Sequence, residues 1–339
     1  MSIFKLKQYM SNLNLKSKEE RTFDAIVIGS GISGGWAAKE LTEKGLKTLV
    51  LERGRDIKHG EYPTANSDPW DFKYRGLLTR EEKARQFKQH RTGYTTRPTH
   101  NFYFVDDIDH PYNEDKRFDW MRGYHVGGRS LMWGRHSYRW SEMDFEANAK
   151  DGFGVDWPIR YKDIEPWYDY VERFVGISGM KENLAQCPDN NYQPAMGLNC
   201  VEEHTRQKIA ENFGGRVMTQ GRIAHLTAPN PDIHKGRGSC QYRNRCMRGC
   251  PYGAYFSSNS STLPAAYATG NLTMRPFSIV TEIMYDKDAK KATGVKIIDT
   301  NTNEEVEFYS KIVFSCASAV GVDEAGGRAR ILTDLGEAD

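Results

Sequence analysis

Three glycines near the start of the chain, Gly29, Gly31 and Gly34, form a G-x-G-x-x-G pattern that limits the fold more than any other feature. The pattern follows the short apolar run FDAIVIG. It opens the segment SGISGGWAAKELTEKG, which has helical spacing and ends at Gly45. A second apolar run, KTLVLE, comes next. Two such runs around an amphipathic segment, within about thirty residues, predict a β-α-β unit.

Each glycine of this pattern has a physical role in a nucleotide-binding turn. The first permits a tight turn, the second lets the backbone approach a pyrophosphate, and the third lets helix and strand pack closely. The N-terminus of the helix then faces the phosphates. Glu52 ends the second apolar run, where a carboxylate can accept hydrogen bonds from a ribose diol. The sequence therefore predicts a dinucleotide site, and the motif alone does not choose between NAD and FAD.

Length and charge exclude other classes of function. The 339 residues are 38% hydrophobic, which is enough for one large or two ordinary domains. Lys plus Arg exceed Asp plus Glu by only 47 to 45, which argues against a dedicated nucleic-acid binder or a polybasic membrane binder. No apolar run approaches the roughly 20 residues of a transmembrane segment. Residues 1–21 are polar and lack the features of a secretory signal, so we expect a loose leader there.

The remaining chain combines irregular stretches with a late series of strands. Residues 55–120 and 181–239 are weakly patterned, and between them we expect a helix from Ile164 to Val175, with Asp163 as its N-cap and Pro166 in its first turn. After residue 270, the runs NLTMRPFSIVTEIMYD, ATGVKIIDT, EEVEFYS and KIVFSCAS are typical of successive strands. A β-α-β start followed by such a series predicts an α/β fold with an added antiparallel layer.

The segment Val126-Gly-Gly-Arg-Ser-Leu-Met-Trp-Gly-Arg135 resembles the flavin-facing loop of the glucose-methanol-choline (GMC) oxidoreductases. The likeness is strongest to the branch with pyranose oxidase and the FAD-linked glucose, fructose and gluconate dehydrogenase large subunits. It extends from about Phe23 to Ser318 and includes IVIGSGISGGWAAKELTEKGLKTLVLERG and WPIRYKDIEPWYDYVERFVGISG. The resemblance implies a Rossmann-like FAD-binding domain over residues 22–339, interleaved with a partial substrate domain at about 55–120 and 181–239. The antiparallel substrate layer is then incomplete.

The resemblance also assigns cofactor contacts. Gly29, Gly31 and Gly34 would hold the pyrophosphate and Glu52 the adenosine ribose, while Val280 would meet the adenine through its backbone. The flat isoalloxazine ring would be lined by Gly127, Gly128, Ser130 and Trp133. Two adjacent glycines suit that place because side chains there would block close approach of the backbone. Pyranose oxidases carry a histidine linked covalently to the flavin where this chain has Met132, so we expect FAD to be bound non-covalently.

Three cysteines, Cys240, Cys246 and Cys250, lie within eleven residues and are followed by Pro251. Iron–sulfur clusters are held by thiolates on short loops of this kind. The spacing also resembles the three-cysteine site of FAD-linked glucose and fructose dehydrogenase large subunits, which holds a [3Fe–4S] cluster. Three interpretations stay open: such a cluster, unliganded thiols, and zinc or a disulfide. For zinc, His234 is the nearest candidate for a fourth ligand.

Oxidation of an alcohol by a flavin needs a base for the hydroxyl proton. In the GMC family this base is a histidine near the C-terminus of a longer chain, and none of the nine histidines here lies in a comparable segment. We expect His125 and His136, which flank the flavin-loop segment, to be structural. No catalytic residue is therefore assigned in this chain, and we expect the base beyond residue 339, with the family's C-terminal segment absent.

These observations favour an FAD-dependent oxidoreductase that acts on CH–OH groups of a sugar or glycoside. Electrons would leave the flavin for an acceptor, and a small subunit and a cytochrome are the partners that the resemblance implies if the cysteines hold a cluster. The alternatives are a truncated, catalytically inactive FAD-binding fragment or structural subunit, and an NAD-linked dehydrogenase. The sequence is compatible with a cytoplasmic chain and with export alongside a signal-bearing partner.

Overall fold

The computed structural model describes residues 18–93 and 95–318. The chain divides into two compact units. The first contains the residues up to 133 together with 245–251 and those from 257 onward, and the second contains residues 134–244 and 252–256. The predicted leader, residues 1–21, lies outside the described residues except for a turn at 18–21.

The first unit is built on one sheet, which has six strands among the described residues. Their order is β3-β2-β1-β6-β5-β4, where β1 pairs in parallel with β2 and β6, and β2 pairs in parallel with β3. The other two pairs, β4 with β5 and β5 with β6, are antiparallel. The strands are β1 (Thr22–Ile28), β2 (Thr48–Leu51), β3 (Leu272–Arg275), β4 (Ser278–Asp286), β5 (Lys291–Asp299) and β6 (Glu305–Ser315).

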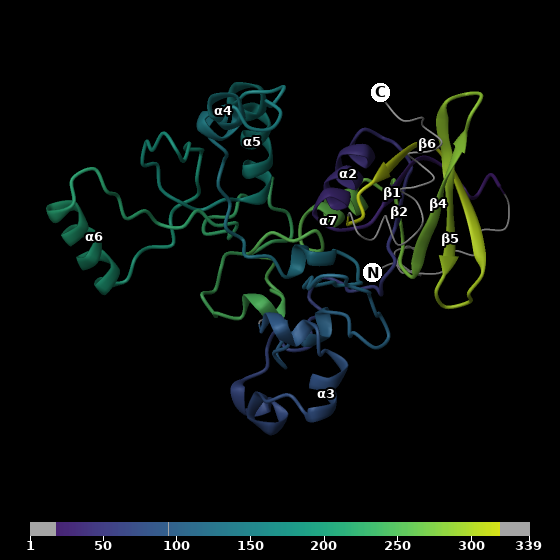
Figure 1. Cartoon of the computed structure of the whole chain (residues 1–339), viewed down its shortest axis with the longest axis horizontal. Helices are drawn as coiled ribbons and strands as arrows, with labels where there is room; N and C mark the ends of the chain where they lie inside the picture. The colour runs from purple at the N-terminus through teal and green to yellow at the C-terminus, as the bar shows by residue number, and fades with distance from the viewer. Residues whose placement is uncertain (1–17, 94, 319–339) are drawn as a thin grey trace. The chain divides into compact units, whose positions relative to one another are not determined.

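Alternation along β1 divides the core into two faces. Ala25 and Val27 face helices α2 (Ile32–Glu43) and α7 (Thr262–Ala268), which lie beside β1 and β2 in Figure 1. Ile26 and Ile28 face the opposite way and pack with Val295 and other apolar residues of β5 and β6. One face of the parallel strands is thus covered by helices and the other by the sheet's own antiparallel end. This arrangement buries every residue of β2, as expected for a strand covered on both sides.

The predicted α/β fold with late antiparallel strands is confirmed. The structure refines one point, because the antiparallel strands continue the parallel sheet through β6 instead of forming a separate layer. Between β2 and α7, the first unit has little regular structure. It contains helix α3 (Arg80–Arg85) and several short 3-10 helices, among them η6 (Gly128–Leu131) and η7 (Cys246–Arg248).

The second unit contains helices α4 (Glu142–Asp151), α5 (Tyr161–Val175) and α6 (Cys200–Asn212). The expected start of α5 was wrong, because Arg160 is the N-cap and Asp163 is the third helical residue. The Asp163 carboxylate accepts a hydrogen bond from the backbone N–H of Arg160 at 2.8 Å. Pro166 consequently lies in the second turn. The buried guanidinium of Arg139 binds the Glu172 carboxylate and ties α5 to the segment before α4.

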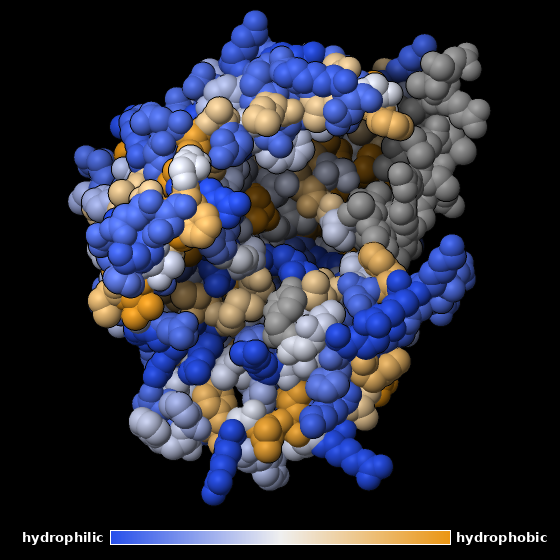
Figure 2. Space-filling model, turned by 60° about the vertical axis from the view of Figure 1, so that its left-hand side comes forward, coloured by the Kyte–Doolittle hydropathy of each residue, from blue (hydrophilic) through white to orange (hydrophobic). Residues whose placement is uncertain are grey.

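Polar side chains cover most of the face shown in Figure 2, with smaller apolar areas among them. None of the helices in the described part of the chain is long and apolar enough to cross a bilayer.

Candidate cofactor site

A cavity of about 770 Å³ opens in the first unit at the carboxyl ends of β1, β2 and β6. In open α/β sheets, ligands bind at this edge, where the strands end and the connections diverge. The cavity is lined by residues 28–33, 51–53, 120–124, 128–130, 133, 278–283 and 315–318. Seven of the nine predicted cofactor residues are in this lining: Gly29, Gly31, Glu52, Gly128, Ser130, Trp133 and Val280. The other two, Gly34 and Gly127, are not in the lining, but they allow the lining segments to pack closely.

The glycine turn, residues 29–34, needs its first and third glycines for reasons internal to the protein. Gly29 has φ +91°, a conformation that side chains disfavour, and its N–H donates to the Leu51 carbonyl at 2.7 Å. A Cβ at Gly34 would lie 1.9 Å from the Gly29 carbonyl oxygen. These two glycines therefore let the chain turn sharply and let α2 begin directly against β1.

Gly31 has no such internal requirement. Its φ is −63°, and no atom in the described part of the chain lies within 4 Å of the position that a Cβ would take. Gly31 is also the N-cap of α2, and no described side chain caps this helix terminus. Its first turn contains no acidic residue, and Ile32 and Ser33 are exposed. The free N–H groups and the positive end of the helix dipole thus point to an anionic ligand, beside a glycine that neither its conformation nor its described surroundings require.

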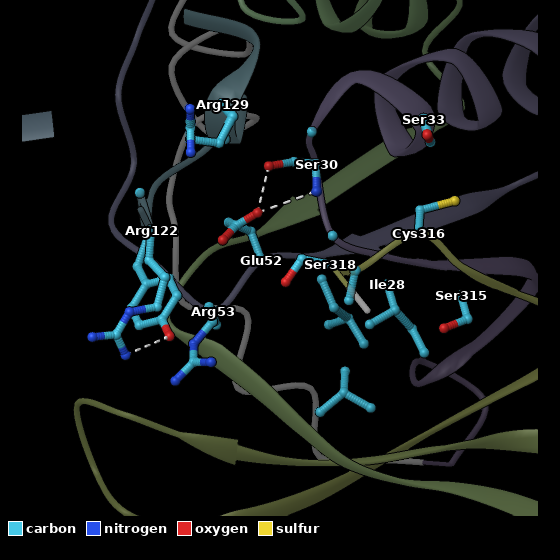
Figure 3. A pocket seen from close by; sticks show the side chains of 18 of the residues that line it. Ile28, Ser30, Ser33, Glu52, Arg53, Arg122, Arg129, Ser315, Cys316 and Ser318 are labelled. Atoms are coloured by element: carbon cyan, nitrogen blue, oxygen red, sulfur yellow. Dashed lines mark hydrogen bonds between the residues drawn. The ribbon is translucent and has the colours of Figure 1, made fainter. Parts of the chain in front are cut away.

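Glu52 lies directly after β2, and hydrogen bonds within the chain hold its side chain. The carboxylate accepts hydrogen bonds from the Ser30 N–H at 3.1 Å, the Ser30 hydroxyl at 2.6 Å and the Gly54 N–H at 3.0 Å. Figure 3 shows the side chains of Ser30 and Glu52 facing each other across the cavity wall. Burial raises the pKa of the Glu52 carboxyl, and the hydrogen bonds from Ser30 and Gly54 oppose this rise.

The glycine-pair loop, residues 126–133, forms the next part of the wall. Gly127 and Gly128 both have positive φ, +84° and +48°. A Cβ at Gly127 would lie 1.6 Å from Oδ1 of Asn259, and one at Gly128 would lie 3.4 Å from the Cα of Gly31. The glycine pair thus brings this loop directly against the glycine turn, and Gly128 lines the cavity without a side chain.

A buried polar run before α7, residues 257–262, connects the two loops, and the sequence analysis missed it. The backbone N–H of Ser258 donates to the Ser130 hydroxyl, and the Ser258 hydroxyl donates to the Gly31 carbonyl, both at 2.9 Å. The Asn259 amide donates to the carbonyls of Ile57 and Val126. Six consecutive small polar residues, SSNSST, were the one sequence signal, and they indicated neither that the run is buried nor which distant residues it bonds.

Val280 lies on β4 where this strand borders the cavity. The pairing of β4 with β5 shifts register between Val280 and Glu282, which is a β-bulge. Bulges interrupt the ladder of hydrogen bonds and redirect the strand beside binding sites. The start of β4 is held by Arg275, whose guanidinium binds Ser278 and pairs with Asp299 at 2.7 Å in a fully buried ion pair.

Three arginines line the cavity: Arg53, Arg122 and Arg129. The Arg53 guanidinium lies 3.7 Å from the ring centre of Tyr124, and that of Arg122 lies 4.5 Å from Trp120. Stacking of this kind holds a guanidinium in place. The fixed positive charge favours an anionic ligand such as a diphosphate.

The family model described as GMC oxidoreductase matches residues 23–322. The chain belongs to the GMC oxidoreductase family. The resemblance inferred from the sequence is thereby confirmed.

Among the relatives of this GMC chain are three dehydrogenases. The 2-methyl-1,2-propanediol dehydrogenase of Mycolicibacterium austroafricanum is 27% identical over 308 residues, which cover 88% of this chain and 49% of the relative. The fructose dehydrogenase large subunit of Gluconobacter japonicus is 25% identical, with coverage of 74% and 44%. The gluconate 2-dehydrogenase flavoprotein of Pantoea cypripedii is 24% identical, with coverage of 88% and 51%. The chain spans about half the length of these relatives.

GMC oxidoreductases bind FAD, and the cavity of this chain fits that cofactor. An uncapped helix terminus and an open glycine suit the diphosphate, a buried carboxylate suits the ribose, and a glycine pair suits a flat ring. The side chain of Met132 is buried in an apolar cluster with Leu131 and Tyr103 and does not line the cavity.

The two histidines beside the glycine-pair loop differ in environment. His125 is 1% exposed, its Nδ1 lies 3.0 Å from the Val126 carbonyl, and burial lowers its pKa to about 4. A buried, neutral imidazole away from the cavity lining is consistent with the expected structural role. His136 belongs to the second unit, where its ring stacks on Tyr138.

The cysteine cluster receives no support as a metal site. Cys240 belongs to the second unit and Cys246 and Cys250 to the first, and none of the three is in a disulfide in the described part of the chain. Among the described residues, no three His, Cys, Asp or Glu side chains converge to hold a metal ion. His234 is a poor zinc ligand as well, because its Nδ1 accepts a hydrogen bond from the Asn230 N–H and its Nε2 bonds the Arg173 carbonyl. The iron–sulfur and zinc interpretations are therefore not supported.

Proposed function

We propose that this chain is the FAD-binding part of an oxidoreductase that oxidises the CH–OH group of a sugar, a glycoside or a related polyol. The observation that carries the proposal is Gly31. It is a glycine that neither backbone conformation nor packing of the described chain requires, at an uncapped helix terminus in a large cavity. A cofactor diphosphate supplies the missing reason for a glycine there.

When bound, FAD supplies a hydride acceptor for the oxidation of a carbon that bears a hydroxyl. The chain's own contribution is binding and orientation. Under the proposal, Glu52 would accept hydrogen bonds from the ribose hydroxyls, the start of α2 would bind the diphosphate, and Gly128, Ser130 and Trp133 would line the ring; the positions of these residues in the cavity wall support these roles. Val280, which lines the cavity on β4, would contact the adenine through its backbone.

The substrate class rests on the names of the relatives, which include a fructose dehydrogenase large subunit and a gluconate 2-dehydrogenase flavoprotein. For the whole protein we propose a polyhydroxylated substrate and an electron acceptor supplied by a partner. The proton-accepting histidine is proposed to lie in sequence beyond residue 339.

The test of cofactor binding is a titration of the purified chain with FAD, followed by quenching of flavin fluorescence. We expect saturable binding by the wild type and at least tenfold weaker binding by Gly31→Val, with unchanged thermal unfolding. The matched control is Gly214→Val. Gly214 likewise has negative φ and no described atom within 4 Å of its Cβ position, but lies outside the cavity lining. Tight binding of NAD with no binding of FAD would refute the proposal.

The test of chemistry is anaerobic mixing of the FAD-loaded chain with fructose, gluconate, glucose and a vicinal diol. Bleaching of the flavin absorbance by any of these supports oxidation by this chain. A flavin that stays oxidised with all of them is the result expected when the proton-accepting histidine lies outside these residues, and it agrees also with the alternative, a catalytically inactive FAD-binding part or structural subunit.

A further inference from the structure

Ser30, which lies between the first two glycines of the turn, forms hydrogen bonds with Glu52 and with the glycine-pair loop. Its hydroxyl donates to Oε2 of Glu52 at 2.6 Å and accepts a hydrogen bond from the backbone N–H of Gly127 at 2.9 Å. Gly127 is 97 residues away in sequence. Ser30 is completely buried, so its hydroxyl has no access to solvent to replace either bond.

The two partners of this hydroxyl belong to different parts of the cofactor site. Glu52 faces the ribose end under the proposed function, and Gly127 begins the turn that presents Gly128 and Ser130 to the ring. A hydroxyl can donate one hydrogen bond while accepting others, so a single group satisfies both partners in one orientation. Moving either partner would leave a buried donor or acceptor unpaired, which is costly.

We propose that Ser30 is a positioning residue whose hydroxyl couples the Glu52 carboxylate to the glycine-pair loop, so that the adenosine and flavin ends of the cofactor bind as one unit. This inference rests on the proposed function, because it requires FAD as the ligand. Ser30 would touch neither the reacting carbon nor the hydride acceptor. Its effect would pass through Glu52 on one side and through the Gly127 amide on the other.

The coupling predicts a specific pattern of affinities in Ser30→Ala. ADP occupies only the ribose and diphosphate part of the site, whereas FAD also requires the glycine-pair loop. Loss of a hydrogen bond to a charged group weakens an equilibrium by about tenfold or more, and loss of a neutral one by about fivefold. We therefore expect Ser30→Ala to weaken the affinity for ADP by roughly tenfold and the affinity for FAD by roughly 50-fold or more. The ratio of the FAD affinity to the ADP affinity then falls about fivefold.

The matched control is Ser310→Ala, which removes a buried, hydrogen-bonded hydroxyl of β6 outside the cavity lining. We expect both affinities of this variant to stay within twofold of the wild type. Ser30→Cys, which nearly preserves volume and bonds more weakly than a hydroxyl, should fall between Ser30→Ala and the wild type. Thermal unfolding of each variant shows whether the fold is intact.

A second measurement reads the loop directly, without any ligand. Hydrogen exchange of the Gly127 amide should speed up by at least tenfold in Ser30→Ala, because this amide loses its acceptor, and should not change in Ser310→Ala. An unchanged affinity ratio with an unchanged Gly127 exchange rate would overturn the inference while leaving the proposed function intact. Failure of the wild type to bind FAD would overturn the proposed function, and the coupling inference with it.

Discussion

Substituting alanine for Gly34 and for Gly31 separates packing from ligand binding within one motif. The Gly34 Cβ would lie 1.9 Å from the Gly29 carbonyl oxygen, whereas real Cβ contacts are essentially never below 3.0 Å. The backbone must therefore yield by about 1 Å, which separates α2 from β1 and loosens the core around Ala38 and Leu41. Overpacking of this kind costs about 1–3 kcal/mol, and a backbone clash belongs at the upper end.

The same change at Gly31 meets no described atom within 4 Å and is compatible with φ −63°. Alanine reduces the entropy of the unfolded chain, which stabilises by about 0.4–1 kcal/mol, but is a poorer N-cap than glycine by a similar amount. We therefore expect the free energy of unfolding of Gly31→Ala to stay within about 1 kcal/mol of the wild type.

Urea unfolding of the ligand-free chain, followed by circular dichroism, measures both variants against the wild type. The expected result is a clear loss of stability for Gly34→Ala and almost none for Gly31→Ala. Equal losses in both variants, or a Gly34→Ala chain as stable as the wild type, would refute the assignment of Gly34 to packing and Gly31 to a ligand.

Three further predictions concern the frame of the site. Burial lowers the pKa of His125 from 6.5 to about 4, so the free energy of unfolding should fall by about 3 kcal/mol in total as the pH drops from 6.5 to 4. Urea unfolding at a series of pH values should show a weaker pH dependence in His125→Gln. An unchanged pH dependence would contradict a buried, neutral His125. Asp299→Ala should cost about 3–5 kcal/mol because it leaves the Arg275 guanidinium buried and unpaired. The double variant with Arg275→Met should recover most of that loss in the same assay, whereas no recovery would exclude the ion-pair explanation. Gly127→Ala should destabilise by about 1–3 kcal/mol, given φ +84° and a contact of 1.6 Å with Asn259; a Tm equal to that of the wild type would contradict this.

The sequence was informative where the determinants are local. A strand, a glycine turn and a helix follow one another directly between residues 22 and 52. Residue types and their spacing therefore predicted the β-α-β unit, and Glu52 lies beside the turn. The late strands were equally readable from their β-branched and aromatic content. Their place in the sheet was not, because pairing β6 with β1 joins residues almost 290 positions apart.

The polar frame of the site could not be read from local pattern. Ser258 bonds to Gly31 across 227 residues and Asn259 to Ile57 across 202, and such partners follow from tertiary packing. The start of α5 failed for a related reason. An aspartate at the third helical residue can accept a hydrogen bond from the N-cap backbone, so Asp163 resembled an N-cap although the helix begins three residues earlier than expected, at Tyr161.

The central claim is that the start of α2 binds the diphosphate of FAD, and a crystal structure of the chain with FAD tests it most directly. The account predicts diphosphate oxygens within hydrogen-bond distance of the backbone N–H groups of Gly31 and Ile32, with the isoalloxazine ring against Gly128. Electron density for the diphosphate away from this helix terminus, or for the ring away from the glycine pair, would contradict it.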